Sequence, residues 1–225
     1  INGWIKEGKP DADPAQAWVR CYHLMGNGYW SGSPSQGELF HEGCDDKGPT
    51  VTVMRLKAGS QQHLLSNGDE KLVGGYAGVS WSVHSGTTRG AEQYKTSPTS
   101  FAFSLTNKRR HGLYDVGDSF SWNSDKKAKW VAGERAVYHH ASVHFGPGFG
   151  DGPDFLIEQG VSGGLRVTCR PFGRTFKCGD GVSEGDCAED FCGSKEDRQI
   201  IELEVWHRFL TCDERCDARG TKRRR

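Results

Sequence analysis

A histidine and a cysteine lie close enough in this sequence to form a thiol–imidazole pair, in which the histidine would act as the base and the cysteine as the nucleophile. His41 and Cys44 have the spacing that, on a helix, brings an imidazole beside a thiol. Cys44 also opens a run typical of turns, so we favour a structural cysteine that is buried or disulfide-bonded. The sequence therefore predicts no catalytic residue, and a thiol-dependent or metal-dependent enzyme is kept as an alternative.

Cysteines cluster toward the end of the chain, in Gly- and Asp-rich sequence. The eight candidates for disulfides are Cys21, Cys44, Cys169, Cys178, Cys187, Cys192, Cys212 and Cys216. An even number in such sequence predicts disulfides and an oxidising compartment, with the connectivity left open. The alternative is structural zinc, for which the Cys187/Cys192 and Cys212/Cys216 spacings and the nearby His207 would serve.

Histidine and aspartate clusters are the remaining candidates for metal ligands. On a strand, His140 and His144 share a face while His139 points the other way, which favours structural histidines over a ligand set. Hard oxygen ligands for calcium are offered by three acidic pairs, namely Asp45 with Asp46, Asp151 with Asp154, and Asp180 with Asp186. None matches an EF-hand, so we predict no metal site and no cofactor, with calcium as the alternative.

Tryptophans in polar surroundings are candidates for stacking on a ligand such as a glycan. Trp4, Trp30 and Trp122 have such surroundings, whereas Trp81, Trp130 and Trp206 fall in or beside strand patterns and are expected in the core. The candidate binding residues are accordingly Trp30 and Trp122, with Asp151 and Asp154.

Alternation of apolar and polar residues indicates several short strands. These are expected over residues 18–24, 50–56, 72–81, 101–105, 137–145, 155–157, 165–169 and 201–205. A short helix is expected over 35–41, where Ser35 and Glu38 have the spacing of a capping box. Loops are expected over 59–71, 84–100 and 107–128, and a tight turn with positive φ over 146–152.

Composition and charge narrow the class of protein. Lys plus Arg and Asp plus Glu both number 29, so there is no overall basic excess of the kind that nucleic-acid binding requires. No apolar run is long enough to span a membrane. The many short strands predict a mostly β (α+β) fold of sandwich type, with antiparallel sheets.

Three stretches in order resemble the TLDc domain family. The first is Phe40 to Val53, which leads into Gly74-Gly75-Tyr76 and Ser80-Trp81. The second is Ser100 to Asn107. The third is Gly146 to Ile157, with Ile201 to Trp206 as the closing strand. The resemblance implies a β-sandwich of two antiparallel sheets flanked by a few short helices. It divides the chain into an irregular leader (1–17), the domain (18–208) with a cysteine-rich insertion (173–193), and a basic tail that contains cysteines (209–225).

The resemblance also bears on function. Most characterised members are intracellular, protect against oxidative stress and bind the vacuolar proton pump, and no accepted catalytic mechanism defines the family. The extra cysteines instead favour a secreted or lumenal binding module whose partner is a protein, a glycan or a second copy of itself. A cytoplasmic regulator of the proton pump is the alternative.

The first shared stretch contains a run that we interpret as structural. Cys44, Asp45, Asp46, Gly48 and Pro49 are expected to form a turn that starts the following strand. Gly74 and Gly75 are expected to mark a close backbone approach or a bulge within a strand.

Overall fold

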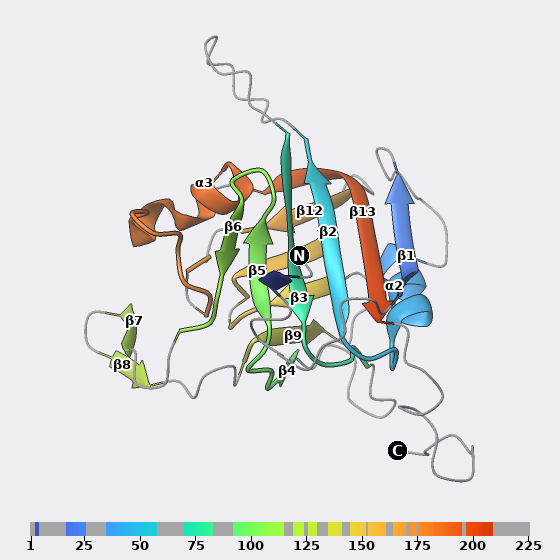
Figure 1. Cartoon of the computed structure of the whole chain (residues 1–225), viewed down its shortest axis with the longest axis horizontal. Coiled ribbons are helices and arrows are strands. Elements are labelled where there is room, and N and C mark those ends of the chain that lie inside the picture. The colour runs from blue at the N-terminus through green and yellow to red at the C-terminus, as the bar shows by residue number, and fades with distance from the viewer. Residues whose placement is uncertain are drawn as a thin grey trace.

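The chain folds into two antiparallel β-layers with short helices at their edges (Figure 1). The computed structural model describes residues 3–4, 17–25, 35–57, 70–82, 92–114, 119–123, 126–129, 135–140, 145–151, 153–160, 164–169, 172–173, 175–194 and 197–208. Within these ranges there is no helix long and apolar enough to cross a membrane.

Along the described residues, short strands are interrupted by short helices. They are β1 (Trp18–Met25), α2 (Gln36–Cys44), β2 (Thr50–Leu56), β3 (Lys71–Ala77), β4 (Glu92–Lys95), β5 (Phe101–Ser104), β6 (Arg109–His111), β7 (Ser119–Asn123), β8 (Lys126–Lys129), β9 (Val137–His140), β10 (Phe145–Phe149), β11 (Phe155–Gln159), β12 (Leu165–Thr168), the 3₁₀ helix η1 (Glu184–Asp186), α3 (Cys187–Cys192) and β13 (Arg198–Arg208). The mostly β class predicted from the sequence is confirmed.

One layer, sheet A, has the strand order β1-β13-β2-β3-β5-β6, and the other, sheet B, has the order β4-β9-β10-β11-β12. Strand β13 belongs to both sheets. Its first residues, Arg198 and Gln199, pair with β12, and the residues from Ile200 onward pair with β2 and β1. The register shifts between Ile200 and Glu202, so a bulge marks the place where β13 passes from one layer to the other.

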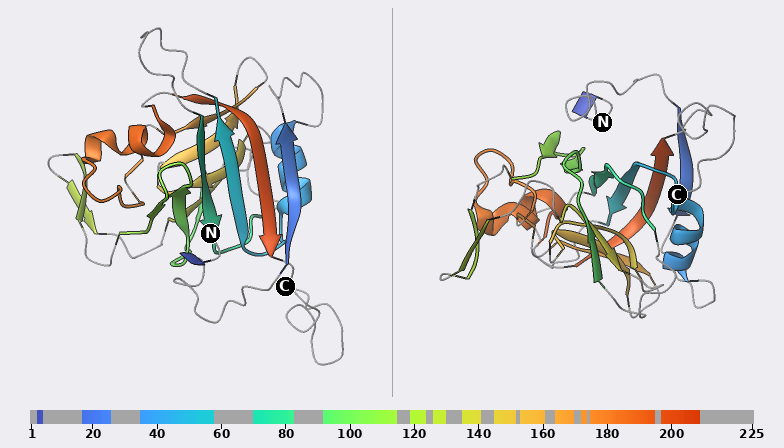
Figure 2. Two further views of the ribbon diagram at one scale, coloured as in Figure 1. Left: turned by 45° about the horizontal axis from the view of Figure 1, so that its top comes forward. Right: turned by 90° about the horizontal axis from the view of Figure 1, so that it is seen from below.

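Side chains from both layers form the main core, and Figure 2 shows the layers from two further directions. Trp81 and Phe149 meet edge to face with ring centroids 5.7 Å apart, and Phe149 stacks on Phe155 at 4.6 Å. The Trp81 indole nitrogen donates to Thr50 Oγ1 at 2.8 Å, so the buried polar end of this ring is satisfied.

Helix α2 closes one side of the sandwich against β1. Its predicted capping box is confirmed, because the Ser35 hydroxyl accepts from the Glu38 amide and the Glu38 carboxylate accepts from the Ser35 amide. A Cβ at Gly43 would collide with the Cys21 carbonyl oxygen, so the helix lies directly against the strand.

Sheet A also carries an apolar group on the face that points away from sheet B. We call this group the outer aromatic cluster. Its buried members are Val51, Tyr76, Phe101 and Phe103, and Trp4, Trp18, Val53 and Leu105 pack against it.

Several elements differ from expectation. The predicted loops over 84–100 and 107–128 contain β4, β6, β7 and β8, and part of the predicted turn over 146–152 is β10. Among the described residues of that segment, Gly150 has a positive φ, of 85°. Gly148 instead faces the Tyr138 and Leu156 side chains, where a Cβ would lie 2.8 and 3.0 Å from their nearest atoms, so its lack of a side chain serves packing. Trp206 is only partly buried, because it lies on the outer face under Arg20, at 5.6 Å.

Candidate functional site

The run from Cys44 to Pro49 forms the turn that precedes β2. Gly48 has φ +90° and Asp46 has φ +57°, so two residues take the left-handed conformation that such a turn requires. The Gly48 amide donates to Ser80 Oγ at 2.7 Å, and the Asp45 carboxylate lies 2.9 Å from His41 Nδ1. These contacts hold the turn against neighbouring parts of the chain and give its residues a structural role.

Gly74 and Gly75 mark close approaches on opposite faces of β3. A Cβ at Gly74 would collide with the Thr52 carbonyl oxygen and lie 2.8 Å from Phe103 Cζ, and one at Gly75 would lie 2.7 Å from the Phe149 ring. The pairing of β3 with β2 and β5 shows no register shift here. Of the two expected explanations, the close approach is the one observed.

Three of the possible disulfides are present. Cys21 pairs with Cys44, Cys169 with Cys192 and Cys178 with Cys187, at Cα–Cα distances of 5.2, 6.4 and 5.3 Å. The pairing removes Cys44 as a thiol partner for His41 and removes Cys187 and Cys192 as zinc ligands. Cys212 and Cys216 lie outside the described residues.

A serine motif in the insertion lacks the context of a nucleophile. Residues 181–185 match the Gly-x-Ser-x-Gly pattern of serine hydrolases, which places its serine between a strand and a helix. Here the segment leads from a loop into η1, and the Ser183 hydroxyl donates to the Asp186 carboxylate at 2.6 Å. In a second match, over 160–164, the serine lies outside the described residues.

The candidate binding residues Asp151 and Asp154 are buried. Asp154 accepts from the Gly173 amide at 2.7 Å and from the Thr175 amide at 2.9 Å, and Asp151 pairs with Arg135 at 3.1 Å. Both carboxylates are thus engaged within the chain, and that of Asp154 holds the Gly173 and Thr175 amides at the start of the cysteine-rich insertion.

The other candidate residues are not brought to this region by any described contact. Trp122 lies in β7, and Trp30 lies outside the described residues. Trp4 packs against the outer aromatic cluster. His139 is in β9, and His144 is outside the described residues.

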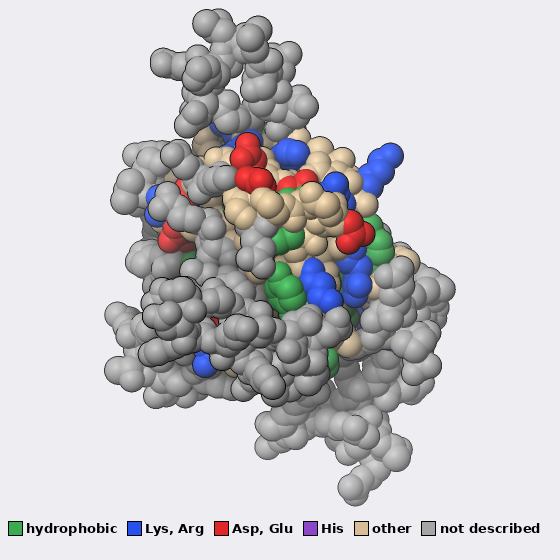
Figure 3. Space-filling model, turned by 90° about the vertical axis from the view of Figure 1, so that its left-hand side faces the viewer, with side chains coloured by type: hydrophobic (Ala, Val, Ile, Leu, Met, Phe, Trp, Pro, Cys, Tyr) green, Lys and Arg blue, Asp and Glu red, His purple; other side chains and the backbone are tan. Residues whose placement is uncertain are grey.

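A concavity with a volume of about 680 Å³ lies between β6 and the cysteine-rich insertion. Four cationic residues line it, and Asp180 is the acidic residue among the described lining residues. We call it the basic groove; the residues that define it are Lys108, Arg109, Arg110, Tyr114, Lys177 and Gly179. Figure 3 looks onto the side of the molecule that carries β6 and α3 and shows Lys and Arg side chains there, with Asp and Glu side chains among them.

Local structure sets the position of each cation in the groove. Lys108 projects from the turn after β5, where its φ is +54°. Arg109 pairs with Asp190 of α3 at 3.0 Å, and a Cβ at Gly179 would collide with its guanidinium group. The Arg110 guanidinium carbon lies 4.7 Å from the centre of the Phe101 ring, and Lys177 Nζ lies 6.0 Å from that of Tyr114.

Two disulfides fix the wall of the basic groove that the insertion builds. Cys178 lines the groove and is joined to Cys187 at the start of α3, while Cys192 at the end of α3 is joined to Cys169 next to β12. Helix α3 in turn supplies Asp190, which holds Arg109. The insertion therefore positions one wall rigidly against the edge strand β6.

His111, the last residue of β6, is buried next to the residues that line the groove. Its Nδ1 lies 3.0 Å from the Lys177 carbonyl oxygen, an acceptor, so Nδ1 carries the proton. The ring meets Phe172 and Phe191 edge to face at 5.1 and 5.5 Å. Burial lowers the pKa of His111, and the contact with the Lys177 carbonyl partly offsets that effect.

A second polar group lies on the outer face of sheet A. His23, Glu202 and Glu204 bring potential metal-ligating atoms within 4.8 Å of one another. Two arginines already pair with the carboxylates, Arg20 with Glu204 at 2.8 Å and Arg55 with Glu202 at 3.2 Å. A cation would have to displace these ion pairs, so the basic groove is the better candidate site.

The sequence contains one signal for the groove, the three successive cations Lys108-Arg109-Arg110 within the expected loop over 107–128. It could not reveal Lys177 or Asp190, which reach the same place from more than sixty residues along the chain.

A comparison with protein families matches the TLDc domain model to residues 11–209, which cover both sheets, α2, the insertion and the groove. No curated protein matches the chain. The family match spans most of the sequence and agrees with the fold, and the chain belongs to the TLDc domain family.

Proposed function

We propose that this chain is a non-catalytic binding module that receives an acidic segment of a protein partner in the basic groove. The observation that carries the proposal is the set of four cations around one concavity in a chain whose formal net charge is zero. A local concentration of positive charge in a cleft raises the local concentration of an anionic partner and orients it.

Two features favour a protein segment over a nucleic acid. The chain has no overall basic excess, because Lys plus Arg and Asp plus Glu both number 29, whereas binding to nucleic-acid backbones depends on such an excess. The described lining also includes Pro98, Leu113 and Tyr114, so apolar and aromatic surface lies among the cations. Such mixed lining suits the side chains of a peptide.

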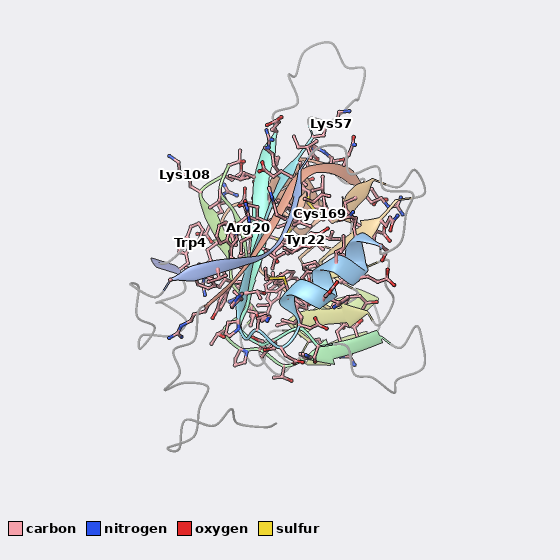
Figure 4. All side chains as sticks on the ribbon, turned by 90° about the vertical axis from the view of Figure 1, so that its right-hand side faces the viewer. Trp4, Arg20, Tyr22, Lys57, Lys108 and Cys169 are labelled. Carbon is pink, nitrogen blue, oxygen red and sulfur yellow. A yellow bond between two sulfur atoms is a disulfide. The ribbon has the colours of Figure 1, made fainter. Side chains whose placement is uncertain are left out.

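Binding of an oligoglutamate peptide, measured by titration calorimetry at low ionic strength, tests the proposal. Lys108→Glu, which reverses a charge at the groove, is expected to weaken binding by about tenfold, or about 1.4 kcal/mol. Lys57→Glu is the matched control, because Lys57, which directly follows β2, is also exposed but is not among the residues that line the groove, and Figure 4 shows it apart from Lys108. Equal losses in both variants, or tighter binding of an oligonucleotide or a sulfated glycan, would contradict the proposal.

We also propose that the module works in an oxidising compartment, secreted or lumenal. The three disulfide pairs support this location, because such bonds persist where thiols are not kept reduced. Thiol titration of the denatured protein should then find no free thiol from these six cysteines. At most two free thiols, from Cys212 and Cys216, are expected, and six or more would contradict the location.

A further inference from the structure

The outer aromatic cluster is unusual in its position. Phe101 and Phe103 of β5 are fully buried although they point away from sheet B. Tyr76 packs against Phe101 with ring centroids 5.2 Å apart, and Phe101 against Phe103 at 6.2 Å. The outward face of sheet A thus carries a row of aromatic rings that other parts of the chain keep from solvent.

A residue from the start of the chain lies on this row. The Trp4 ring lies 6.2 Å from that of Phe103, tilted by 38°. The segment of Gly3 and Trp4 lies in front of β3 and β5, where Figure 1 marks the N-terminus. A Cβ added at Gly3 would have no atom within 4 Å, so the contact of this segment with the sheet is made by the tryptophan ring.

Gly74 helps to form the surface on which the Trp4 ring lies, which we call the aromatic seat. It is the partner of Phe103 across the strand pair, and any side chain there would collide with Thr52 and Phe103. The missing side chain lets the Phe103 ring lie flat over β3, where Trp4 meets it.

Arg110 joins the outer aromatic cluster to the basic groove. It pairs with Phe103 across β5 and β6, its guanidinium group lies over Phe101, and it lines the groove. A single extended peptide could therefore place an aromatic side chain on the cluster and acidic side chains in the groove. Figure 4 shows Trp4 and Lys108 on the same side of the molecule.

We infer that Trp4 occupies, within the chain, a seat for an aromatic side chain of the acidic partner segment. This inference rests on the proposed function and names its partner more closely: a protein segment that carries acidic residues next to a tryptophan or phenylalanine. Tryptophan is the residue most often responsible for binding energy at interfaces, and Trp4 competes with it for the seat.

The competition has a measurable consequence. When a site is open in only a fraction of molecules, the apparent dissociation constant rises by the reciprocal of that fraction. Removing the Trp4 ring should therefore tighten binding of a peptide with an aromatic end and leave a peptide without one unaffected.

The experiment compares two dye-labelled oligoglutamate peptides, one ending in tryptophan and one in alanine, by fluorescence anisotropy. With the unaltered chain, the two peptides are expected to bind alike. With Trp4→Ala, the tryptophan peptide is expected to bind about tenfold more tightly than the alanine peptide. Trp4→Phe keeps a ring on the seat and serves as the control, with both peptides expected to bind alike.

The outcomes separate the two proposals. If the alanine peptide binds but Trp4→Ala brings no gain for the tryptophan peptide, the aromatic seat is wrong and the basic groove stands. If neither peptide binds any of these proteins, both are wrong. Thermal melting shows whether Trp4→Ala remains folded, and Trp4→Leu, which keeps apolar cover without a ring, repeats the comparison if it does not.

Discussion

The guanidinium group of Arg110 lies 4.7 Å above the ring of Phe101 and at the same time lines the basic groove. One side chain therefore belongs to an apolar cluster through its flat face and to a charged concavity through its position. Arginine suits this double role because its guanidinium is planar, permanently charged and weakly hydrated.

Arg110→Leu is expected to separate these two contributions. Leucine keeps apolar cover on Phe101 but removes a charge, so oligoglutamate should bind about fivefold more weakly while the free energy of unfolding changes by less than about 1 kcal/mol. Arg110→Lys keeps the charge and should bind more like the unaltered chain. Calorimetric titration and thermal melting measure the two effects. Unchanged binding in Arg110→Leu would show that Arg110 serves only to cover Phe101.

His111 predicts a dependence of stability on pH. Burial lowers its pKa in the folded state, whereas the unfolded chain takes up a proton near the ordinary value of about 6.5. The unfolded state then binds more protons, so stability falls as pH drops below about 6.5 and levels off below the folded pKa. In denaturant unfolding, His111→Gln should show a shallower fall, by up to about 1.4 kcal/mol per pH unit. Parallel curves for the two proteins would contradict this.

Local patterns in the sequence predicted the fold well wherever neighbouring residues decide the structure. The Ser35–Glu38 capping box and the alternation in β2 are local signals: β2 forms where predicted, and α2 begins as predicted but extends to Cys44, beyond the predicted end at residue 41. Strands β4 and β6 were missed because their residues are polar; β4 is held by pairing with β9, more than forty residues along the chain, and β6 by pairing with the neighbouring β5.

The candidate site was harder to predict for the same reason. Asp154 looked like a free ligand in a Gly-rich loop, but it accepts hydrogen bonds from amides about twenty residues away. Only the folded chain shows that Lys108 and Lys177 meet at one concavity.

The turn from Cys44 to Pro49 yields a graded prediction about stability. Gly48→Val puts a β-branched residue at φ +90° and should lower the free energy of unfolding by about 1–3 kcal/mol. Asp45→Ala removes a carboxylate that lies 2.9 Å from His41 Nδ1 and strains no backbone, so it should cost less. Peptide binding should fall only as folded protein is lost. An Asp45→Ala protein with an unchanged melting temperature and no binding would show that the turn is a functional site.

Two disulfides should rank in opposite order when their removal is measured by stability and by binding. Cys178–Cys187 forms the wall of the basic groove and closes a loop of sequence separation 9, whereas Cys21–Cys44 ties β1 to α2 with a separation of 23. Entropy of the unfolded chain predicts that replacing either pair by alanine costs about 3 kcal/mol, with the larger loss for the longer loop.

Binding should follow the reverse order. Without Cys178–Cys187, the loop that carries Gly179 is no longer joined to the start of α3, and the wall of the groove beside Arg109 and Lys177 is no longer fixed. Oligoglutamate binding should therefore fall by about tenfold, measured at a temperature where the protein is folded. Cys21–Cys44 lies at the edge of sheet A formed by β1, whereas the groove lies at the edge formed by β6. Without this disulfide, the folded protein should therefore bind as the unaltered chain does. Calorimetric titration well below the melting temperature of each double variant measures this. If both double variants bind like the unaltered chain, the insertion does not shape the groove, and the cysteines of the insertion serve stability alone.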